Sequence, residues 1–228
     1  MKLIFRRPAE AGSLAAPRLA REALPDWLKA MPAQAWSEVA GAELRTLKHC
    51  PPFLDAMRAG VLLPLAEDLH FDGEDFSWSG DPEAPPLAER SPIGIHAPEQ
   101  AQGAPFAPKG EFIVKFLNRW AIETPPGWSL LVVHPFNRLD LPFRTLAGIV
   151  EADLFRLGLI HFPALWVDPD FRGILPKGTP VAQILPIPRE PLQIELRPLT
   201  PEEAAEQAAL RESLATEPGV YRRLRTGD

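Results

Sequence analysis

Short apolar runs, separated by polar segments rich in proline and glycine, dominate the second half of the chain. The runs are enriched in β-branched and aromatic residues. Short strands that recur about every 8–12 residues between turn signals are typical of an all-β barrel or sandwich. We therefore predict a mainly antiparallel β core whose strands lie at 112–116, 120–123, 128–134, 147–151, 157–162 and 181–187.

Two turns between these runs contain glycine next to proline or lysine. Residues 124–127 read Thr-Pro-Pro-Gly, and residues 176–179 read Pro-Lys-Gly-Thr. Proline fixes φ at one turn position and glycine supplies φ > 0 at the next, which suits a type II turn at 124–127. We expect both segments to reverse the chain between strands.

Helices are predicted only near the two ends of the chain. Residues 25–31 are bracketed by prolines, with Asp26 at the expected cap. Residues 51–59 begin with proline and precede Gly60, which fits the left-handed position after a helix. The strongest start is Thr200, because proline follows it and a glutamate lies three residues further on. We expect one C-terminal helix there.

The predicted elements divide the chain into three parts. Residues 1–109 form an α/β, loop-rich segment that packs on the core, and it includes a buried strand at 61–65. Within it, residues 72–110 are rich in Asp, Glu, Pro and Gly and form a long surface excursion. Residues 110–197 form the β core, and residues 198–228 form the C-terminal helix and tail.

Composition sets the expected compartment and excludes two classes of partner. A single cysteine, Cys50, precludes an internal disulfide, and the first residues lack the apolar core of a signal peptide, so we expect a cytoplasmic protein. A net charge of −6 is not the basic footprint of a nucleic-acid binder, and we interpret the basic patch at 222–225 as a solvated tail. No run approaches the roughly 18 apolar residues of a membrane span. We expect neither nucleic acid nor a membrane as partner.

Three motifs occur in order between residues 120 and 195. Thr-Pro-Pro-Gly-Trp-Ser-Leu-Leu lies at 124–131, Ala-Gly-Ile-Val-Glu-Ala-Asp at 147–153, and Lys-Gly-Thr-Pro-Val-Ala-Gln-Ile at 177–184. In this order and spacing they resemble the dUTPase and dCTP deaminase family. The resemblance implies a β-clip fold, which is a compact antiparallel roll, and a homo-oligomer, since such proteins are commonly trimers.

The residues that carry the chemistry of that family are largely replaced. Position 151 is Glu, where dUTPases carry Asp and the deaminases carry Glu. His-Pro-Phe-Asn at 134–137 stands in place of the phosphate segment Arg-Ser-Ser, and Leu154 or Phe155 in place of the tyrosine that gates the pyrimidine pocket. The glycine-rich C-terminal arm has no counterpart. A triphosphate needs several N–H donors and cations around it, so we do not expect nucleotide hydrolysis.

Three further segments are shared with another group of proteins. Lys-His-Cys-Pro-Pro-Phe-Leu-Asp-Ala lies at 48–56, Lys-Phe-Leu-Asn-Arg-Trp at 115–120, and Gly-Thr-Pro at 178–180. With these segments the chain resembles a family of bacterial and phage proteins built on a domain of unknown function. This resemblance implies no activity.

Five polar residues are candidate ligand-binding residues. The resemblance implies that Glu151 and Gln183 face the ligand, with His134 and Asn137 in place of the phosphate segment. Asp153 forms a candidate acid–base pair with Glu151, because neighbouring carboxylates shift each other's pKa. The alternative is that Glu151 and Asp153 are solvated acids at a strand end, and that His134 is a hydrogen-bonded histidine in the core or at its edge. An acidic, amide-rich pocket would suit a polar, non-phosphorylated ligand, and burial would raise the pKa of Glu151.

A metal site is a weaker alternative. His70-Phe-Asp72 has the spacing of two ligands in a 2-His-1-carboxylate iron site, and the third ligand would have to be His96, His134 or His161. An ordinary acidic loop explains the same residues, so we expect no metal and no cofactor. The pairs at 118–119 and 137–138, Asn-Arg in each case, either hold loops together or recognise a carboxylate.

The sequence therefore predicts a β-clip-like binding protein for a small polar ligand or for a partner protein, assembled as a homo-oligomer, either a trimer or a dimer. The alternative is an enzyme, either a diverged nucleotide hydrolase or deaminase-like protein, or a 2-His-1-carboxylate oxygenase. No catalytic residue can be assigned for that alternative from these patterns.

Overall fold

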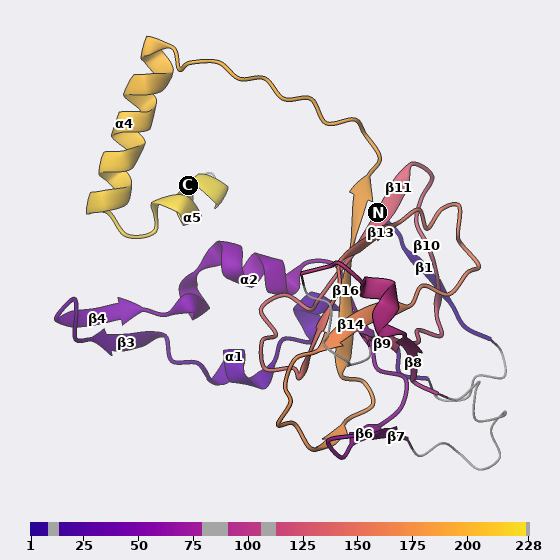
Figure 1. The fold of residues 1–228 in the computed structure, drawn as a ribbon. Helices are drawn as coiled ribbons and strands as arrows, with labels where there is room; N and C mark the ends of the chain where they lie inside the picture. Colours follow the sequence, from indigo (N-terminus) through magenta and orange to yellow (C-terminus); the bar gives the residue numbers. More distant parts are fainter. Residues whose placement is uncertain (9–13, 79–90, 106–112, 227–228) are drawn as a thin grey trace. The chain divides into compact units, whose positions relative to one another are not determined.

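A computed structural model describes residues 1–8, 14–78, 91–105 and 113–226 (Figure 1). The chain divides into two compact units, Met1–Arg189 and Glu190–Asp228, each of which is described by itself below. The first unit combines strands from both the first 109 residues and the following segment, since β5 of the former pairs with β16 of the latter.

The largest sheet of the first unit has five strands. Every neighbouring pair in it is antiparallel. The predicted runs at 128–134 and 181–187 form its two central strands, flanked by strands from distant parts of the chain. Its order is β13 (Gly148–Val150), β11 (Trp128–Val133), β16 (Pro180–Pro188), β5 (Val61–Pro64) and β2 (Arg18–Leu19).

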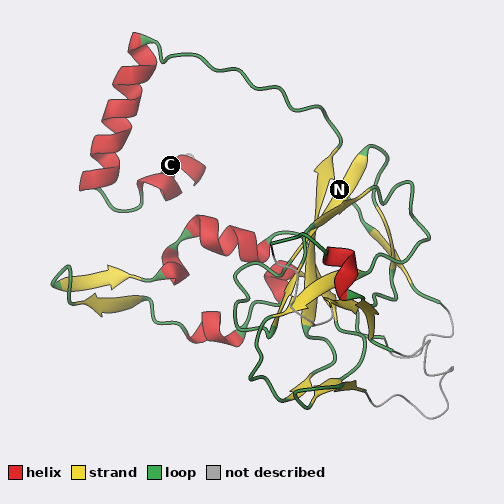
Figure 2. Cartoon of the chain, in the orientation of Figure 1, coloured by secondary structure: helices red, strands yellow, loops and turns green. Residues whose placement is uncertain are grey.

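A second sheet has four strands, also antiparallel, and three smaller pieces complete the β structure (Figure 2). The four-stranded order is β12 (Phe143–Thr145), β14 (Phe162–Trp166), β9 (Ile113–Phe116) and β8 (Ile93–His96). The smaller sheets are β15 (Gly173–Leu175) with β6 (Leu69–Phe71) and β7 (Phe76–Ser77), β1 (Ile4–Arg6) with β10 (Ala121–Glu123), and β3 (Gln34–Ser37) with β4 (Ala42–Arg45).

The core of the first unit is shared by the two larger sheets. In β11, Leu130 and Val132 are buried while Leu131 between them is more exposed, as period-2 alternation requires. From the four-stranded sheet, Phe116 and Phe143 meet edge to face with ring centroids 4.6 Å apart, and Phe162 is buried in the same cluster. Burial of this apolar area is the main favourable term that holds the two sheets together.

The helices of the first unit are short. They are η1 (Ala20–Glu22), α1 (Asp26–Ala30), η2 (Leu47–His49), α2 (Pro51–Arg58) and η3 (Pro98–Ala101). The sequence predicted Asp26 as the cap of α1, and this prediction is wrong. Pro25 occupies that position, and the Asp26 carboxylate instead accepts a hydrogen bond from Lys29, 2.8 Å away. After α2, Gly60 has a φ of 67°, as predicted, and lies against the carbonyl of Ile184.

The second unit consists of an extended segment, residues 190–199, followed by α4 (Pro201–Thr216) and α5 (Val220–Thr226). The predicted start of α4 is confirmed. The Thr200 hydroxyl accepts from the Glu203 N–H at 3.2 Å, and the Glu203 carboxylate accepts from the Thr200 N–H at 2.8 Å. The second helix, α5, was not predicted.

Two further differences between the sequence predictions and the structure concern strands. Residues 157–162 do not form a strand, because the chain makes a series of turns there and enters the sheet only at Phe162. The hairpin of β3 and β4 was not predicted either, since almost all of its residues are exposed. The fold class is confirmed: the chain is mainly antiparallel β, with short N-terminal helices and a C-terminal helix. Within the described ranges, no helix is long and apolar enough to cross a membrane.

Candidate functional site

Gln183, the strand glutamine of the predicted site, serves the fold. It lies in β16 with only 1% of its surface exposed. Its Oε1 accepts from the Phe136 N–H at 2.9 Å, and its Nε2 donates to the carbonyls of Ala56 at 3.0 Å and Ala59 at 2.6 Å. These bonds join the end of α2 to the turn after β11. The amide is therefore fully occupied, and the void that it lines has a volume of only about 10 Å³.

His134 and Asn137 lie in the same turn, but they have different surroundings. The Nδ1 atom of His134 accepts from the Thr145 N–H at 3.3 Å and its Nε2 donates to the Arg138 carbonyl at 3.0 Å, which defines the neutral Nε2–H tautomer. Burial lowers the pKa of His134, and its ring packs edge-on against Phe143. Asn137 is exposed and has a φ of 59°, so it shapes the turn.

The two acids have separate roles. Glu151 is exposed, so it is not the buried carboxylate that the predicted site required. Asp153 forms an ion pair with Arg189 and accepts from the Gly127 N–H at 3.0 Å. The Arg189 hydrogen bonds hold the pKa of Asp153 well below its usual range. Asp153 therefore stabilises the Pro-Pro-Gly turn as a carboxylate.

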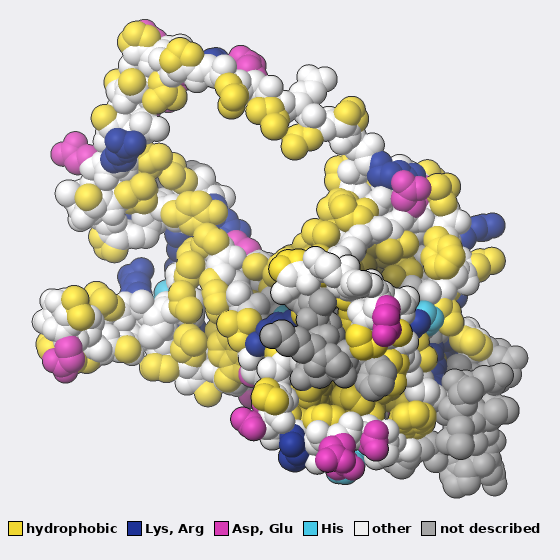
Figure 3. All heavy atoms as spheres, viewed as in Figure 1, with side chains coloured by type: hydrophobic (Ala, Val, Ile, Leu, Met, Phe, Trp, Pro, Cys, Tyr) yellow, Lys and Arg dark blue, Asp and Glu magenta, His cyan; other side chains and the backbone are white. Residues whose placement is uncertain are grey.

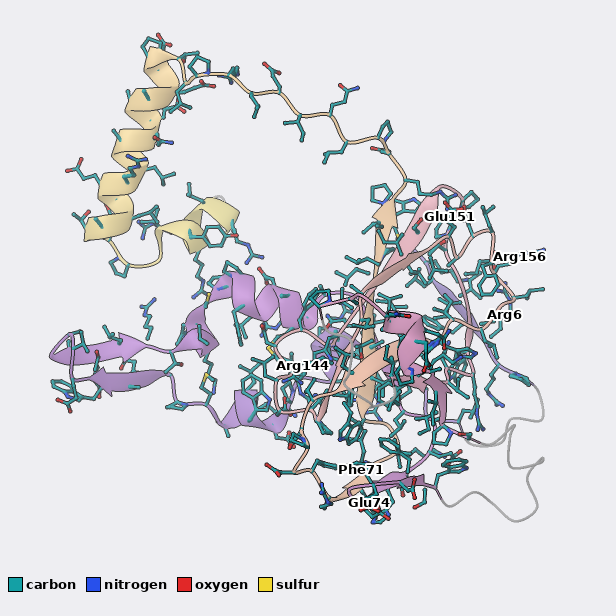
Figure 4. All side chains as sticks on the ribbon, viewed as in Figure 1. Arg6, Phe71, Glu74, Arg144, Glu151 and Arg156 are labelled. Carbon is teal, nitrogen blue, oxygen red and sulfur yellow. The ribbon has the colours of Figure 1, made fainter. Side chains whose placement is uncertain are left out.

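The structure does not bring the five predicted residues into one cluster. Asp153 contacts Gly127, just before β11, whereas Gln183 pairs with Val133 at the far end of that strand. At about 3.3 Å per residue, a strand of this length separates the two sites by roughly 17–20 Å. In Figure 4, Glu151, after β13, and Arg144, the chain neighbour of the Thr145 that bonds His134, lie in different parts of the first unit. The prediction that His134, Glu151 and Gln183 line one pocket is wrong.

The alternative iron site is not assembled either. Among residues outside the masked segments, no three His, Cys, Asp or Glu side chains lie close enough to hold a metal ion. The His70 ring is 3.3 Å from the Ser77 hydroxyl, and the Asp72 carboxylate caps the backbone N–H groups of Glu74 and Asp75. His96 contacts Gln100. The His70–Asp72 segment is thus a capped turn.

A different pocket lies at the other edge of the five-stranded sheet. It has a volume of about 400 Å³, within the range of about 300–1,000 Å³ typical of small-molecule sites. Its floor is formed by Leu62 and Pro64 of β5 and Pro180 of β16. Arg18 of β2 is directly opposite Leu62 in the strand register, so both side chains project from the same face of the sheet.

The charged lining of this pocket is mainly cationic. Four cations, Arg18, Lys29, Arg138 and Lys177, line it together with one carboxylate, Glu22. We call this set the basic pocket. The excess of cations is a local departure, since the whole chain has a net charge of −6. Fixed cations around a cavity favour an anion within it.

Three of these cations are held by carboxylates that do not line the pocket. Arg138 makes a bidentate pair with Asp140, with N–O distances of 2.9 Å. The Nζ atom of Lys177 lies 3.4 Å from a Glu67 oxygen. Lys29 pairs with Asp26, as noted above.

Arg18 forms no ion pair with any residue that the structure describes. It is also exposed, so its guanidinium is available to a ligand. Because β2 is fixed by pairing with β5, the base of this side chain is placed by the sheet.

The walls of the basic pocket are tied to the sheets by hydrogen bonds. The indole Nε1 of Trp120 donates to the carbonyl of Ala15, which lines the pocket, at 3.0 Å. The Lys177 N–H donates to an Asp68 carboxylate oxygen at 2.6 Å, and Gly178 takes a φ of 85° in the predicted turn. Such contacts position the cations before a ligand arrives, which reduces the entropic cost of binding.

Only Arg138 and Lys177 of the four cations lie in segments that the sequence had marked, as the Asn-Arg pair and the Lys-Gly turn. Arg18 and Lys29 were missed. Arg18 reaches the pocket through the pairing of β2 with β5, and β5 in turn pairs with β16, more than a hundred residues further along the chain, whereas Lys29 lies in the short helix α1. A scan against protein-family models finds no match for this chain, and neither does a search of curated proteins.

Proposed function

We propose that this chain is a binding protein for a small anionic molecule, which occupies the basic pocket. The observation that carries the proposal is the convergence of four cations on one cavity of about 400 Å³ in an acidic chain. The sequence had favoured a polar, non-phosphorylated ligand at the Glu151 end of the sheet. The charge of the basic pocket instead supports carboxylates and phosphates.

Arg18 and Arg138 are the central recognition groups. A guanidinium presents a planar fork of donors that matches carboxylate and phosphate oxygens. Arg138 is already held by Asp140, so its guanidinium is fixed in place at the pocket although its charge is partly offset by that carboxylate. Arg18, which forms no ion pair with a described residue, supplies a second fork, and the apolar floor of Leu62, Pro64 and Pro180 accommodates the non-ionic part of the ligand.

Other features of the proposal extend the sequence predictions. A single cysteine and an acidic charge support a cytoplasmic setting without nucleic acid as ligand. The Pro-Pro-Gly and Lys-Gly motifs support a relationship to the β-clip family and, through it, a homo-oligomer. A small-molecule binding role is what the concentration of cations among the described lining residues of the basic pocket supports.

The proposal is tested by titrating the purified chain with inorganic phosphate, pyrophosphate and citrate by calorimetry. The control is Arg156→Gln, which removes the same charge from an exposed site after β13 (Figure 4). Arg18→Gln should weaken binding of the best of these anions about 10- to 100-fold, as expected for lost charge-assisted hydrogen bonds. Arg156→Gln should leave it unchanged. Equal affinities in the two variants, or no binding of any of the three anions, would refute the proposal.

A further inference from the structure

The extended segment of the second unit has an alternating apolar–polar pattern whose apolar side chains are exposed. Between Pro191 and Pro198 the sequence reads Leu-Gln-Ile-Glu-Leu-Arg, with apolar and polar residues in strict alternation. Leu192, Ile194 and Leu196 are 88%, 78% and 92% exposed. Figure 3 shows these side chains as a row of hydrophobic surface along the segment.

Strict alternation in an extended chain places these three side chains on one face. A strand with one apolar face and unpaired N–H and C=O groups is a template for pairing with another chain. The two prolines lack an N–H donor and so limit the pairing segment to residues 192–197. This segment, which we call the arm, therefore has the features of a strand without a partner among the residues that the structure describes.

We propose that the arm pairs antiparallel with the arm of a second copy of this chain, about a two-fold axis at Ile194. In that register Leu192 lies opposite Leu196 of the second copy, and Ile194 lies opposite its own equivalent. Each of the three apolar residues then has an apolar residue as its direct cross-strand neighbour. On the other face, Gln193 lies opposite Glu195.

The charges of the arm select this register over its neighbours. A parallel, in-register pair would place Glu195 beside Glu195, and like charges directly opposite each other are destabilising. An antiparallel pair centred on residue 195 has the same fault. A pair centred on residue 193 leaves Leu196 opposite Glu190. The register centred on Ile194 therefore combines apolar cross-strand neighbours for all three apolar residues with separated carboxylates.

The arm is also held at its end and belongs to a unit that needs a partner. Arg197 makes a bidentate pair with Glu203 of α4, with N–O distances of 2.7 and 2.6 Å, so the end of the arm is fixed to the helix. Among the described apolar residues of this unit, Val220 is buried, whereas Leu214 and Leu224 are more than half exposed. Units of about 40 residues rarely bury enough apolar surface alone, and association supplies what they lack.

Sedimentation equilibrium of the full chain tests the pairing. The wild type should dimerise, at twice the chain mass of 25.2 kDa. Ile194→Lys should weaken the dimer by tenfold or more, since it places two charges at the axis. Gln193→Lys should strengthen it roughly two- to tenfold, because each lysine faces Glu195, and Gln193→Glu should weaken it by a similar factor.

Cysteine cross-linking tests the register. In a Cys50→Ser background, Ile194→Cys should form a disulfide-linked dimer on mild oxidation, because the two thiols face each other across the axis. Gln193→Cys should cross-link far more slowly, since each thiol then faces Glu195. A wild type that remains monomeric, a dimer indifferent to Ile194→Lys, or equal cross-linking at 193 and 194 would overturn the proposal. Loss of anion binding by Arg18→Gln has no bearing on this outcome.

Discussion

Arg189 and Asp153 form a bidentate ion pair that joins the end of β16 to the turn after β13. One guanidinium nitrogen lies 2.6 Å from a carboxylate oxygen, and the second nitrogen contacts the other oxygen. The same carboxylate accepts from the Gly127 N–H of the Pro-Pro-Gly turn. Three segments that are distant in sequence therefore meet at one ionised carboxylate.

Because these bonds depend on ionised Asp153, part of the free energy of unfolding should be lost in acid, where this carboxylate is protonated. The pKa of Asp153 in the folded chain lies below its unfolded value, which is about 4. Its contribution is therefore present above about pH 4 and is lost as the pH falls toward the folded pKa. Asp153→Asn should be less stable than the wild type at pH 7, and the two should converge in acid. Urea unfolding at several pH values measures this, with Asp170→Asn, at an exposed site, as control. A pH-independent difference would contradict it.

His134 should make the free energy of unfolding depend on pH in a second range, above that of Asp153. Burial lowers its pKa below the unfolded value of about 6.5, so the neutral ring stabilises the fold above that pH, and this stability is lost as the pH falls. His161 shifts in the same direction through burial and the charge of Lys115. The variant His134→Gln/His161→Gln should flatten the decline in stability below pH 6.5. His49→Gln, which changes an exposed histidine, should retain the wild-type slope.

The buried amide of Gln183 should be one of the more sensitive positions of the fold. Gln183→Leu keeps the approximate volume but leaves the Phe136 N–H and the carbonyls of Ala56 and Ala59 without their partner. We expect a loss of about 2–4 kcal/mol in the free energy of unfolding. The matched change at an exposed position of α4, Gln207→Leu, should cost no more than about 0.5 kcal/mol. Equal effects of the two changes would show that the Gln183 bonds contribute nothing.

Gly60 and Gly41 provide a matched test of close backbone approach. Both have a left-handed φ, 67° and 59°, so alanine should cost each position about 1–2 kcal/mol for the backbone alone. A Cβ at Gly60 would also lie 2.0 Å from the Ile184 carbonyl oxygen, whereas a Cβ at Gly41 meets nothing within 4 Å. Gly60→Ala should therefore be the more destabilising change in thermal or urea unfolding. Similar losses for both variants would contradict the close packing of α2 on β16.

Strands were predicted correctly where an apolar run in the sequence is buried in the fold and has a paired strand on each side. The run at 128–134 and the run at 181–187 lie in the centre of the five-stranded sheet, and both were found from apolar residues and turn signals. The run at 157–162 has similar composition, but Leu157 and Leu159 are exposed and the chain turns there. The true strand, β14, includes Pro163, a residue that normally argues against an inner strand.

The predicted site failed for a related reason. Gln183 and Asp153 are polar residues next to strands, and their local sequence does not reveal that backbone groups already satisfy them. Arg138 and Lys177 lie in motifs that the sequence had marked, but nothing local indicated that they share a pocket with Arg18, because Arg18 and Lys177 are brought together only through the pairing of β2, β5 and β16. Strand register depends on the whole fold, and it determines both why the predicted site is not assembled and why the basic pocket is.

The most direct test of the basic pocket compares a variant that removes a negative charge with one that removes a positive charge. Each is titrated by calorimetry with whichever of phosphate, pyrophosphate and citrate binds the wild type best. Glu22 is the one carboxylate among the described lining residues, so Glu22→Gln should tighten binding, by about two- to tenfold, whereas Arg18→Gln should weaken it. Affinities that move in opposite directions are the predicted result. Two variants that both bind like the wild type, or that both lose affinity, would contradict an anion site in this pocket.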